Sequence, residues 1–363
     1  MTRVPRRMIL WSPAFDDVTG QALVTRRVAT QMPGVQWTRA IFPAGRGIKA
    51  FGVLGAAAMA WWDVVRHGTR DAYVVCSRSV PGFLRDLPAL ALTLAGVRVV
   101  VHTHGSDLVD LLHHRRVGGL ARILYRRCTV IIPSEHLRAD LVAAGCRHIH
   151  LCENFGQVPA AAFAATPATP PLHVLWNSNL MASKGVRDLV AGIGQARDQG
   201  ADIRIILIGR PLPDREATAA QIADWTTGLA DLPWVDLRGP VPPDEATALL
   251  EQTDLVALPS RYKSECQPLA VIQAMLAGKG LLLGDTPALR ATAGNYPALF
   301  SLSDADSLQR ALQQIAAGHG PNAVDLAKAA QIAQIRFSAD RFTRQMQEIL
   351  LTPDTRSATL SPQ

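Results

Sequence analysis

The chain has 363 residues, which exceeds the size of one ordinary hydrophobic core and fits two. Hydrophobic residues make up 48% and charged residues 18%, so the composition excludes an intrinsically disordered protein. The net charge of +7 is uneven: residues 1–160 hold 20 Lys and Arg against 10 Asp and Glu, and residues 161–363 hold 17 against 20. The first part therefore attracts anions such as nucleic acid, anionic lipid or a phosphorylated acceptor, although a generic arginine-rich surface accounts for the excess equally well.

Cysteine usage argues against disulfides and zinc. The five cysteines are odd in number and widely spaced, which is typical of reduced thiols in a cytosol. No Cys-x-x-Cys or His/Cys cluster has metal-ligand spacing, so we expect no metal site. The first apolar run ends at Pro13 and is too short for a signal peptide. Residues 51–62 form the longest mostly apolar run, which is too short to span a bilayer and predicts a buried or interfacial helix.

Short apolar runs alternate with helical patterns in the first part of the chain. The predicted strands are 7–11, 72–76, 97–102 and 130–133, and the predicted helices are 21–31, 51–66, 83–94 and 134–144. Fully apolar strands that alternate with helices predict a parallel sheet covered on both faces. Residues 156–171 follow; they are rich in Pro and Ala and carry no charge, which predicts an interdomain linker.

The alternation then begins again. The predicted strands are 172–177, 203–209, 235–239, 255–259 and 280–284, and the predicted helices are 185–197, 216–228, 244–252, 268–277 and 308–317. We therefore expect an α/β protein with two doubly wound Rossmann-like domains, at residues 1–160 and 161–338, facing across a cleft. Residues 339–363 add an amphipathic helix, which could cross back to the first domain, and a tail. Open α/β sheets bind ligands outside the carboxyl ends of their strands, so the cleft is the expected active site.

The segment 264–275 carries the most chemical information. Glu265 lies in a predicted loop, Pro268 begins a predicted helix, and Gln273 follows about five residues later, roughly 7.5 Å along the helix axis. Proline suits the first helical turn because the N–H that it lacks would have had no partner. The free N–H groups of that turn form an anion site. An anion site in line with two hydroxyl-binding side chains suits a nucleotide-sugar.

Four further segments precede this one: 177–185 (NSNLMASKG), 206–209 (ILIG), 237–241 (LRGPV) and 254–260 (DLVALPS). Together, over about residues 172–289, these segments resemble the donor half of retaining glycosyltransferases of family 4 (glycosyl transferases group 1), which have the GT-B fold. The first part of the chain resembles the family less closely, mainly at Gly20 and residues 101–105. The resemblance implies an acceptor-binding domain at 1–160 and a nucleotide-sugar donor-binding domain at 161–338.

The resemblance assigns three catalytic residues. Lys184 matches a lysine that stabilises the leaving diphosphate, and Glu265 matches a glutamate that binds the hydroxyls of the donor sugar. His104 matches a histidine near the transferring sugar on the acceptor side. Each residue also has an ordinary structural interpretation: a solvated lysine at a helix start, an acid that complements a helix dipole, and a structural histidine.

The remaining matches concern binding. The Gln267-Pro268-Leu269 segment is expected to present N–H groups to the diphosphate. Val241 matches a residue whose backbone contacts the nucleobase. Gly20 matches a glycine turn near the acceptor and the leaving diphosphate, and its alternative is a plain turn or capping glycine.

Two positions depart from the family pattern. Asn179 stands where the family has an arginine beside the lysine, so we expect weaker diphosphate binding or compensation by Arg210 or Arg261. Gln273 stands where a second glutamate commonly binds the ribose; it keeps the length and one acceptor oxygen but lacks the charge. Its alternative role is a buried contact between helices.

The resemblance implies a metal-independent retaining hexosyltransferase that moves a sugar from a UDP- or GDP-linked donor to a hydroxyl acceptor, in bacterial surface polysaccharide or glycolipid synthesis. No cofactor is expected, because the nucleotide-sugar is a substrate. The alternatives are a catalytically impaired binding or scaffolding protein and a sugar-nucleotide epimerase of the same fold.

The expected partners follow from this function and from the charge distribution. The acceptor would be a sugar or a lipid-linked saccharide. Residues 113–127 combine basic residues with apolar residues at helical spacing, which suits an anionic membrane surface, although an ordinary surface helix fits equally well. No recognition-helix motif or aromatic-interleaved basic patch supports nucleic-acid binding. We expect a cytoplasmic protein that is peripheral on the inner face of the cell membrane if the lipid interaction exists.

Overall fold

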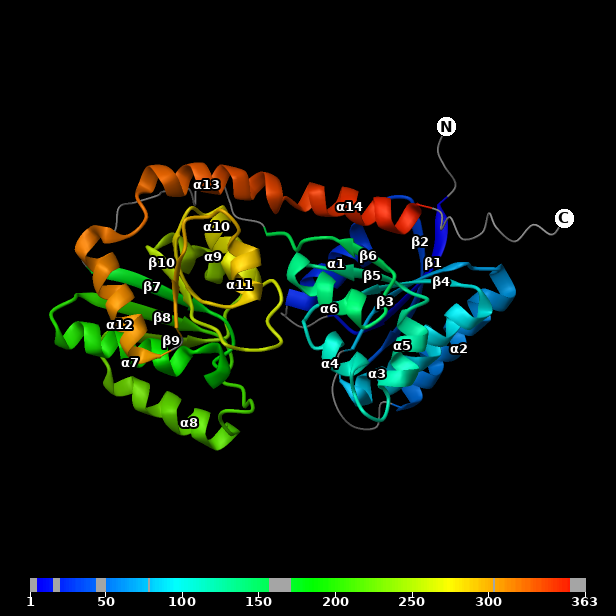
Figure 1. The fold of residues 1–363 in the computed structure, drawn as a ribbon, viewed down its shortest axis with the longest axis horizontal. Helices are drawn as coiled ribbons and strands as arrows, with labels where there is room; N and C mark the ends of the chain where they lie inside the picture. The colour runs from blue at the N-terminus through cyan, green and yellow to red at the C-terminus, as the bar shows by residue number, and fades with distance from the viewer. Residues whose placement is uncertain are drawn as a thin grey trace. The chain divides into compact units, whose positions relative to one another are not determined.

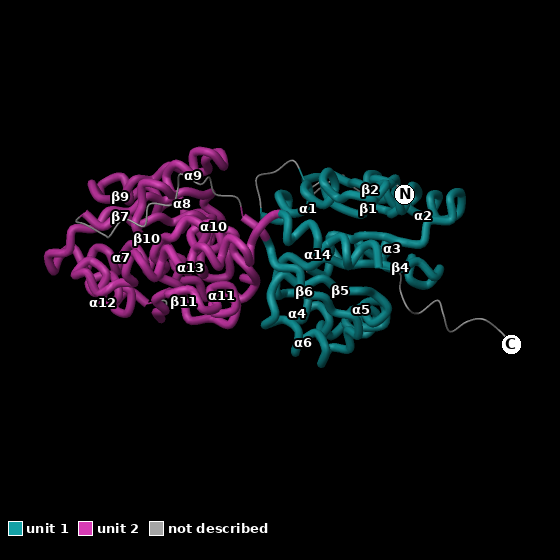
Figure 2. The backbone as a smooth tube through the Cα atoms, turned by 90° about the horizontal axis from the view of Figure 1, so that it is seen from above, with its two compact units in different colours: residues 1–154, 340–363 teal, residues 155–339 magenta. Residues whose placement is uncertain are grey.

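A computed structural model describes residues 5–15, 20–43, 50–77, 79–156, 171–302 and 304–352. The chain divides into two compact units (Figure 2): unit 1 comprises residues 1–154 and 340–363, and unit 2 comprises residues 155–339. Within the described residues, each unit contains one six-stranded parallel sheet with flanking helices. The predicted α/β class with two Rossmann-like units is therefore confirmed. Apart from its first and last residue, the predicted linker at 156–171 lies outside the described residues.

Unit 1 is built on the strand order β2-β1-β3-β4-β5-β6 (Figure 1). Its strands are β1 (Arg6–Pro13), β2 (Val35–Phe42), β3 (Asp71–Val75), β4 (Arg98–His102), β5 (Thr129–Ile132) and β6 (His148–Leu151). Its helices are α1 (Gly20–Gln31), α2 (Ala50–His67), α3 (Val80–Leu90), α4 (Leu108–Leu112), α5 (Gly118–Tyr125) and α6 (Arg138–Ala143), with short 3₁₀ turns at Ala91–Ala95 and Glu135–Leu137. The central strands β3 and β5 are buried throughout, as their apolar sequences predict.

The last helix, α14 (Ala339–Leu351), packs on unit 1. Asp71 is buried and pairs with both Arg6 (Nε–Oδ2 2.6 Å) and Arg98 (Nε–Oδ1 2.7 Å). The two guanidinium groups also donate to carbonyl oxygens at the end of α14, Arg6 to Leu351 at 3.0 Å and Arg98 to Ile349 at 3.1 Å. Two cations at a helix carboxyl terminus satisfy its free carbonyls and complement its dipole, which fixes α14 at this edge of the sheet.

Unit 2 has the strand order β12-β11-β10-β7-β8-β9. Its strands are β7 (Leu172–Asn177), β8 (Ile203–Ile208), β9 (Val235–Gly239), β10 (Leu255–Leu258), β11 (Gly280–Gly284) and β12 (Leu299–Ser301). Its helices are α7 (Val186–Asp198), α8 (Ala219–Gly228), α9 (Pro243–Glu251), α10 (Leu269–Leu276), α11 (Pro287–Ala293), α12 (Ala305–Gln314) and α13 (Ala323–Arg336), with 3₁₀ turns at Ala182–Lys184 and Leu229–Asp231 and a π-helical turn at Ile315–His319. The order reverses between β7 and β10, which is the topological switch point where open α/β sheets bind ligands.

Several elements were not predicted, and most lie at the margins of the units. The edge strands β2 and β6 are largely not buried. Their sequences lack the continuous apolar runs by which the central strands were predicted. The predicted helix at 51–66 is observed as α2, but Phe51 and Trp62 are 77% and 63% exposed, so the buried alternative is wrong. Across the described ranges, no helix is both long enough and apolar enough to cross a membrane.

Candidate functional site

The candidate site lies where the sheet order of unit 2 reverses. β7 pairs in parallel with β10, with Val174 opposite Leu255, so both strands end at the same edge of the sheet. The chain leaves β7 after Asn177 and β10 after Leu258. The loops that follow are therefore neighbours, and they contain Lys184 and Glu265.

Glycine permits the close approach of these loops. Gly185 directly follows Lys184 and has φ +83°, and a Cβ atom there would lie 2.4 Å from the carbonyl oxygen of Pro259. Gly209 has φ +140°, and a Cβ atom there would lie 2.0 Å from the carbonyl oxygen of Ser178. Any other residue would be strained at both positions and would push the loops apart. Gly185 is thus needed for the loop after β7 to pack closely against the loop after β10.

Lys184 and Glu265 form an ion pair in this site. Lys184 Nζ lies 3.3 Å from Glu265 Oε2, and the two side chains are only 14% and 11% exposed. Lys184 Nζ also donates to Ser178 Oγ at 2.8 Å. Ser260 Oγ donates to the same Glu265 oxygen at 3.5 Å. The structure therefore brings together the two unit 2 residues that were predicted to act in catalysis, each supported by a serine from a strand-end loop.

Helix α10 begins just beyond Glu265. Pro268 is its N-cap residue in an extended conformation, so the helix begins at Leu269, one residue later than predicted, and the N-cap side chain makes no capping hydrogen bond. Gln267 is buried at 5% exposure and leads into this turn. Pro268 has no polar side chain that could accept from the first N–H groups of the helix, which begin at Leu269, and such N–H groups at a helix start suit an anion.

Gln273 faces the same end of β7. Asn177 Nδ2 donates to Gln273 Oε1 at 3.4 Å, which joins the last residue of the strand to the middle of α10. Gln273 is half-buried. Glu265, the start of α10 and Gln273 therefore follow one another in the structure in the predicted order. Asn177, which was not predicted, contacts Gln273.

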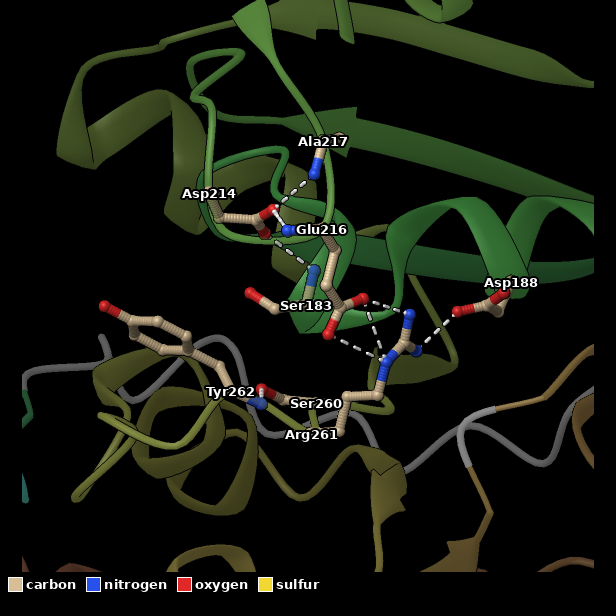
Figure 3. Close-up of polar contacts among 8 residues, drawn as sticks. All are labelled: Ser183, Asp188, Asp214, Glu216, Ala217, Ser260, Arg261 and Tyr262. Carbon is tan, nitrogen blue, oxygen red and sulfur yellow. Dashed lines mark hydrogen bonds and ion pairs between the residues drawn. The ribbon is translucent and has the colours of Figure 1, made fainter. Parts of the chain in front are cut away.

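A polar network fixes the backbone beside Lys184 (Figure 3). The N–H of Ser183 donates to Asp214 Oδ2 at 2.7 Å, and the carbonyl oxygen of Ser183 accepts from the N–H of Arg261 at 3.0 Å. Asp214 also accepts from the N–H groups of Glu216 (2.8 Å) and Ala217 (2.9 Å). The backbone of Ser183 is therefore held between two loops, which fixes the backbone position of the next residue, Lys184.

The side chain of Arg261 forms ion pairs within this network. Its Nη1 lies 2.6 Å from Asp188 Oδ2, and its Nη2 lies 2.6 Å from Glu216 Oε2. These two ion pairs tie the loop after β10 to α7 and to the loop before α8 (Figure 3). Of the two arginines expected to compensate for Asn179, Arg261 thus already has two carboxylate partners.

Arg210 and Asn179 meet through the backbone. The N–H of Arg210 donates to Asn179 Oδ1 at 3.4 Å, and both residues are exposed. Asn179 therefore connects the loops after β7 and β8, a role that an arginine at this position could not fill in the same way because its side chain has no acceptor. Val241 is half-buried after β9 and packs against the core of unit 2.

Replacing Asp214 tests the network. Burial raises the pKa of Asp214, but hydrogen bonds, first from the Ser183 backbone, outweigh it, so the pKa lies below its ordinary value of 3.8. A depressed pKa means that the carboxylate stabilises the fold at neutral pH and that this stability is lost as the pH falls through the folded-state value. Asp214→Ala is expected to lower the free energy of unfolding by about 1–3 kcal/mol at pH 7, and by less at acidic pH. Urea denaturation across pH measures this, with Asp224→Ala on exposed α8 as control; a pH-independent loss would contradict it.

The residues predicted for the acceptor side, Gly20 and His104, lie in unit 1. β4 ends at His102, which is buried; burial lowers its pKa to about 3, and its Nδ1 lies 2.7 Å from the Tyr73 hydroxyl. The ring of His104 lies against that of His102, with centroids 4.3 Å apart. Gly20 is the exposed first residue of α1. His104 is thus supported by a neutral buried histidine, while its action on a donor in unit 2 stays a prediction.

The sequence did not single out several residues of this site. Three of them, Ser178, Ser260 and Asn177, lie inside the segments that carry the family resemblance. Their position at the ends of predicted strands, where α/β sheets bind ligands, could have indicated a role in the site. Asp214 had no such signal, because Ser183, the residue through which it supports the site, lies in a different loop. No group of three or more His, Cys, Asp or Glu in the part of the chain that is described could hold a metal ion.

Residues 171–317 match the family model described as "Glycosyl transferases group 1", which covers the entire site built from Lys184, Glu265 and Gln273. No curated protein sequence matches the chain significantly.

Solved structures resemble the chain over nearly its full length. Anabaena Alr3699/HepE in complex with UDP and glucose has a TM-score of 0.70 at 16% identity, over 96% of this chain and 100% of that chain. Sucrose-phosphate synthase from Thermosynechococcus elongatus has a TM-score of 0.68 at 15% identity, over 95% and 98%. The lipopolysaccharide outer core galactosyltransferase WaaB in its apo form has a TM-score of 0.65 at 11% identity, over 95% and 99%. The chain therefore has the fold of GT-B glycosyltransferases.

Proposed function

We propose that this protein is a retaining, metal-independent glycosyltransferase of family 4 that transfers a hexose from a UDP- or GDP-linked donor to a hydroxyl. The observation that carries the proposal is the ion pair of Lys184 and Glu265 beside the start of α10, at the switch point of a unit that matches a glycosyltransferase family model. UDP and glucose are present in the similar Anabaena structure, which supports a UDP-sugar donor.

Each residue has a role that its position supports. Lys184 and the first N–H groups of α10 would bind the diphosphate, and their attraction would grow as the leaving group gains charge. Glu265 would accept hydrogen bonds from the sugar hydroxyls, and Gln273 from a ribose hydroxyl. The leaving diphosphate would take the acceptor proton on the same face of the sugar, so no second carboxylate is needed. His104 would contact the transferring sugar, the role that the family resemblance implies for it.

The biological setting is also part of the proposal. WaaB is named as a lipopolysaccharide galactosyltransferase, which supports an acceptor of the surface polysaccharide or glycolipid type for a chain of the same fold. A lipid-linked saccharide would place the enzyme in the cytoplasm on the inner face of the cell membrane, in keeping with the basic first part of the chain.

Asn179 and Gln273 favour a second candidate, a glycosyltransferase-fold protein that binds donor without turnover, because they remove two charges of the family pattern. Purified protein incubated with a panel of UDP- and GDP-sugars, with and without acceptor, separates the candidates. Transfer, or slow donor hydrolysis that releases the nucleotide, supports the proposal. Donor binding without any released nucleotide supports the impaired protein, and epimerised donor without acceptor supports an epimerase.

Gln273→Glu is expected to tighten binding of the free nucleotide about threefold to tenfold, because a carboxylate accepts two ribose hydroxyls more strongly than an amide oxygen does. Calorimetric titration of UDP and GDP measures the change. Gln313→Glu, on α12, serves as a control. Unchanged or weaker nucleotide affinity would show that Gln273 supports Asn177 rather than a ribose.

A further inference from the structure

Helix α2 of unit 1 exposes an apolar face to solvent. A surface helix normally turns polar residues outward, but the strongly exposed side chains here include Phe51, Leu54, Met59, Trp62 and Val65, at 48–79% exposure. Successive members are three to five residues apart, so they share one face of the helix. Exposed Gly55 and Ala58 lie on the same face. The outer side of α2 is thus a nearly continuous apolar stripe.

The one acid of α2 points away from this stripe. Asp63 is 3% exposed; it accepts from Thr69 Oγ1 at 2.6 Å and from Arg7 Nη1 at 3.2 Å. On the opposite side from the stripe, α2 packs against β1 and β2 through small residues such as Ala56 and Ala60. The acid of α2 is therefore inside and its large apolar side chains are outside, the reverse of an ordinary amphipathic surface helix.

The stripe continues over the neighbouring helices. α2 contacts α3, and α3 contacts α5, so the three form one layer beside the sheet (Figure 1). This layer adds the exposed side chains of Leu84 on α3, Leu94 on the following 3₁₀ turn, and Leu120 and Ile123 on α5, at 48–64% exposure. Exposed apolar patches of this kind mark interaction sites rather than ordinary surface.

The exposed charged residues of α2, α3 and α5 themselves are all basic, and the adjoining helix α4 carries one exposed acid, Asp110. Arg66 on α2, Arg122 on α5 and Arg126 just after it are exposed, whereas the acids of α2 and α3, Asp63 and Asp86, are buried. The segment leading into α5 adds further exposed arginines, at 115 and 116. An apolar surface bordered by cations complements a bilayer with anionic headgroups, because the apolar side chains enter the interface while arginines pair with phosphates.

We propose that the outer surface of α2, α3 and α5 docks on an anionic lipid bilayer. A second copy of the chain is a poorer occupant, because a two-fold interface would set arginines against arginines. α2 would lie in the plane of the interface with Trp62 and Phe51 inserted, since it is not apolar or long enough to span. The surface does not include the donor site of unit 2, so its function is separable from sugar transfer.

Cosedimentation of the full chain with lipid vesicles tests the proposal. We expect binding to phosphatidylcholine vesicles that contain phosphatidylglycerol, weakening with salt, and little binding to phosphatidylcholine alone. Leu54→Glu/Trp62→Glu should reduce binding at least about tenfold, because two inserted side chains become anions facing an anionic surface. The matched control is Ile332→Glu/Ile335→Glu on α13 of unit 2, where both residues are also exposed (67% and 75%) and no change is expected.

Two results would overturn the proposal. One is vesicle binding by the α2 variant equal to that of the wild type. The other is a wild-type dimer, seen by light scattering, that the α2 variant dissociates while neither protein binds vesicles, since the face would then be a protein interface. Both variants should retain the wild-type melting temperature and donor hydrolysis, so loss of vesicle binding and loss of the proposed enzymatic function remain distinguishable.

Discussion

Lys184→Ala is expected to lower the rate of sugar transfer at least about 100-fold, the loss typical of removing one preorganised donor to a developing anion. Lys184 is the cation that lies within 3.3 Å of Glu265 at the switch point, and it is only 14% exposed. Its attraction to the diphosphate grows as the bond to the sugar breaks, so kcat should fall more than donor affinity. Steady-state kinetics with the best donor measure both constants.

The control for this variant is Lys328→Ala, which removes an exposed lysine from α13 of the same unit. Glu265 keeps Ser260 as a donor in Lys184→Ala, so circular dichroism should show a folded protein. A transfer rate near that of the wild type would mean that the assigned phosphate site is wrong.

Glu265→Gln should separate sugar binding from diphosphate binding. We expect kcat/KM for the donor to fall by about 100-fold, because hydrogen bonds from sugar hydroxyls to a carboxylate are worth about 1.5–3 kcal/mol each. Binding of UDP without sugar should stay unchanged or become tighter, because Lys184 loses its competing carboxylate. UDP affinity should therefore fall in Lys184→Ala but not in Glu265→Gln.

Calorimetry with UDP and with an intact UDP-sugar measures both effects. Glu245→Gln, at an exposed position on α9, is the control for loss of a carboxylate from unit 2. If UDP affinity falls in Glu265→Gln as far as it does in Lys184→Ala, Glu265 supports the position of Lys184 and does not bind the sugar.

The central strands and the core of the site could be predicted because they depend on short sequence patterns, such as apolar runs and a proline at a helix start. The apolar runs of β3, β5 and β10 indicated buried parallel strands, and Pro268 marked the start of α10 to within one residue. Glu265 and Lys184 lie in loops whose positions follow from those strands and from Gly185. At these places, sequence pattern and tertiary packing agree.

The parts that were missed depend on contacts with distant residues. Asp214 acts through the backbone of Ser183, which lies 31 residues earlier, and nothing in its own surroundings indicates that partner. The apolar run of α2 left two alternatives open, a buried helix or an interfacial one, and one side of the helix is exposed in the structure. Periodicity cannot distinguish an apolar face that lacks a partner from one that is covered.

The account depends on a diphosphate site between the end of β7 and the start of α10, and a crystal structure with bound UDP tests it most directly. We expect the diphosphate within hydrogen-bond distance of Lys184 Nζ and of the N–H groups at Leu269 and Ala270, with the ribose beside Gln273. A diphosphate bound elsewhere, with Lys184 still paired only to Glu265 and Ser178, would contradict the account.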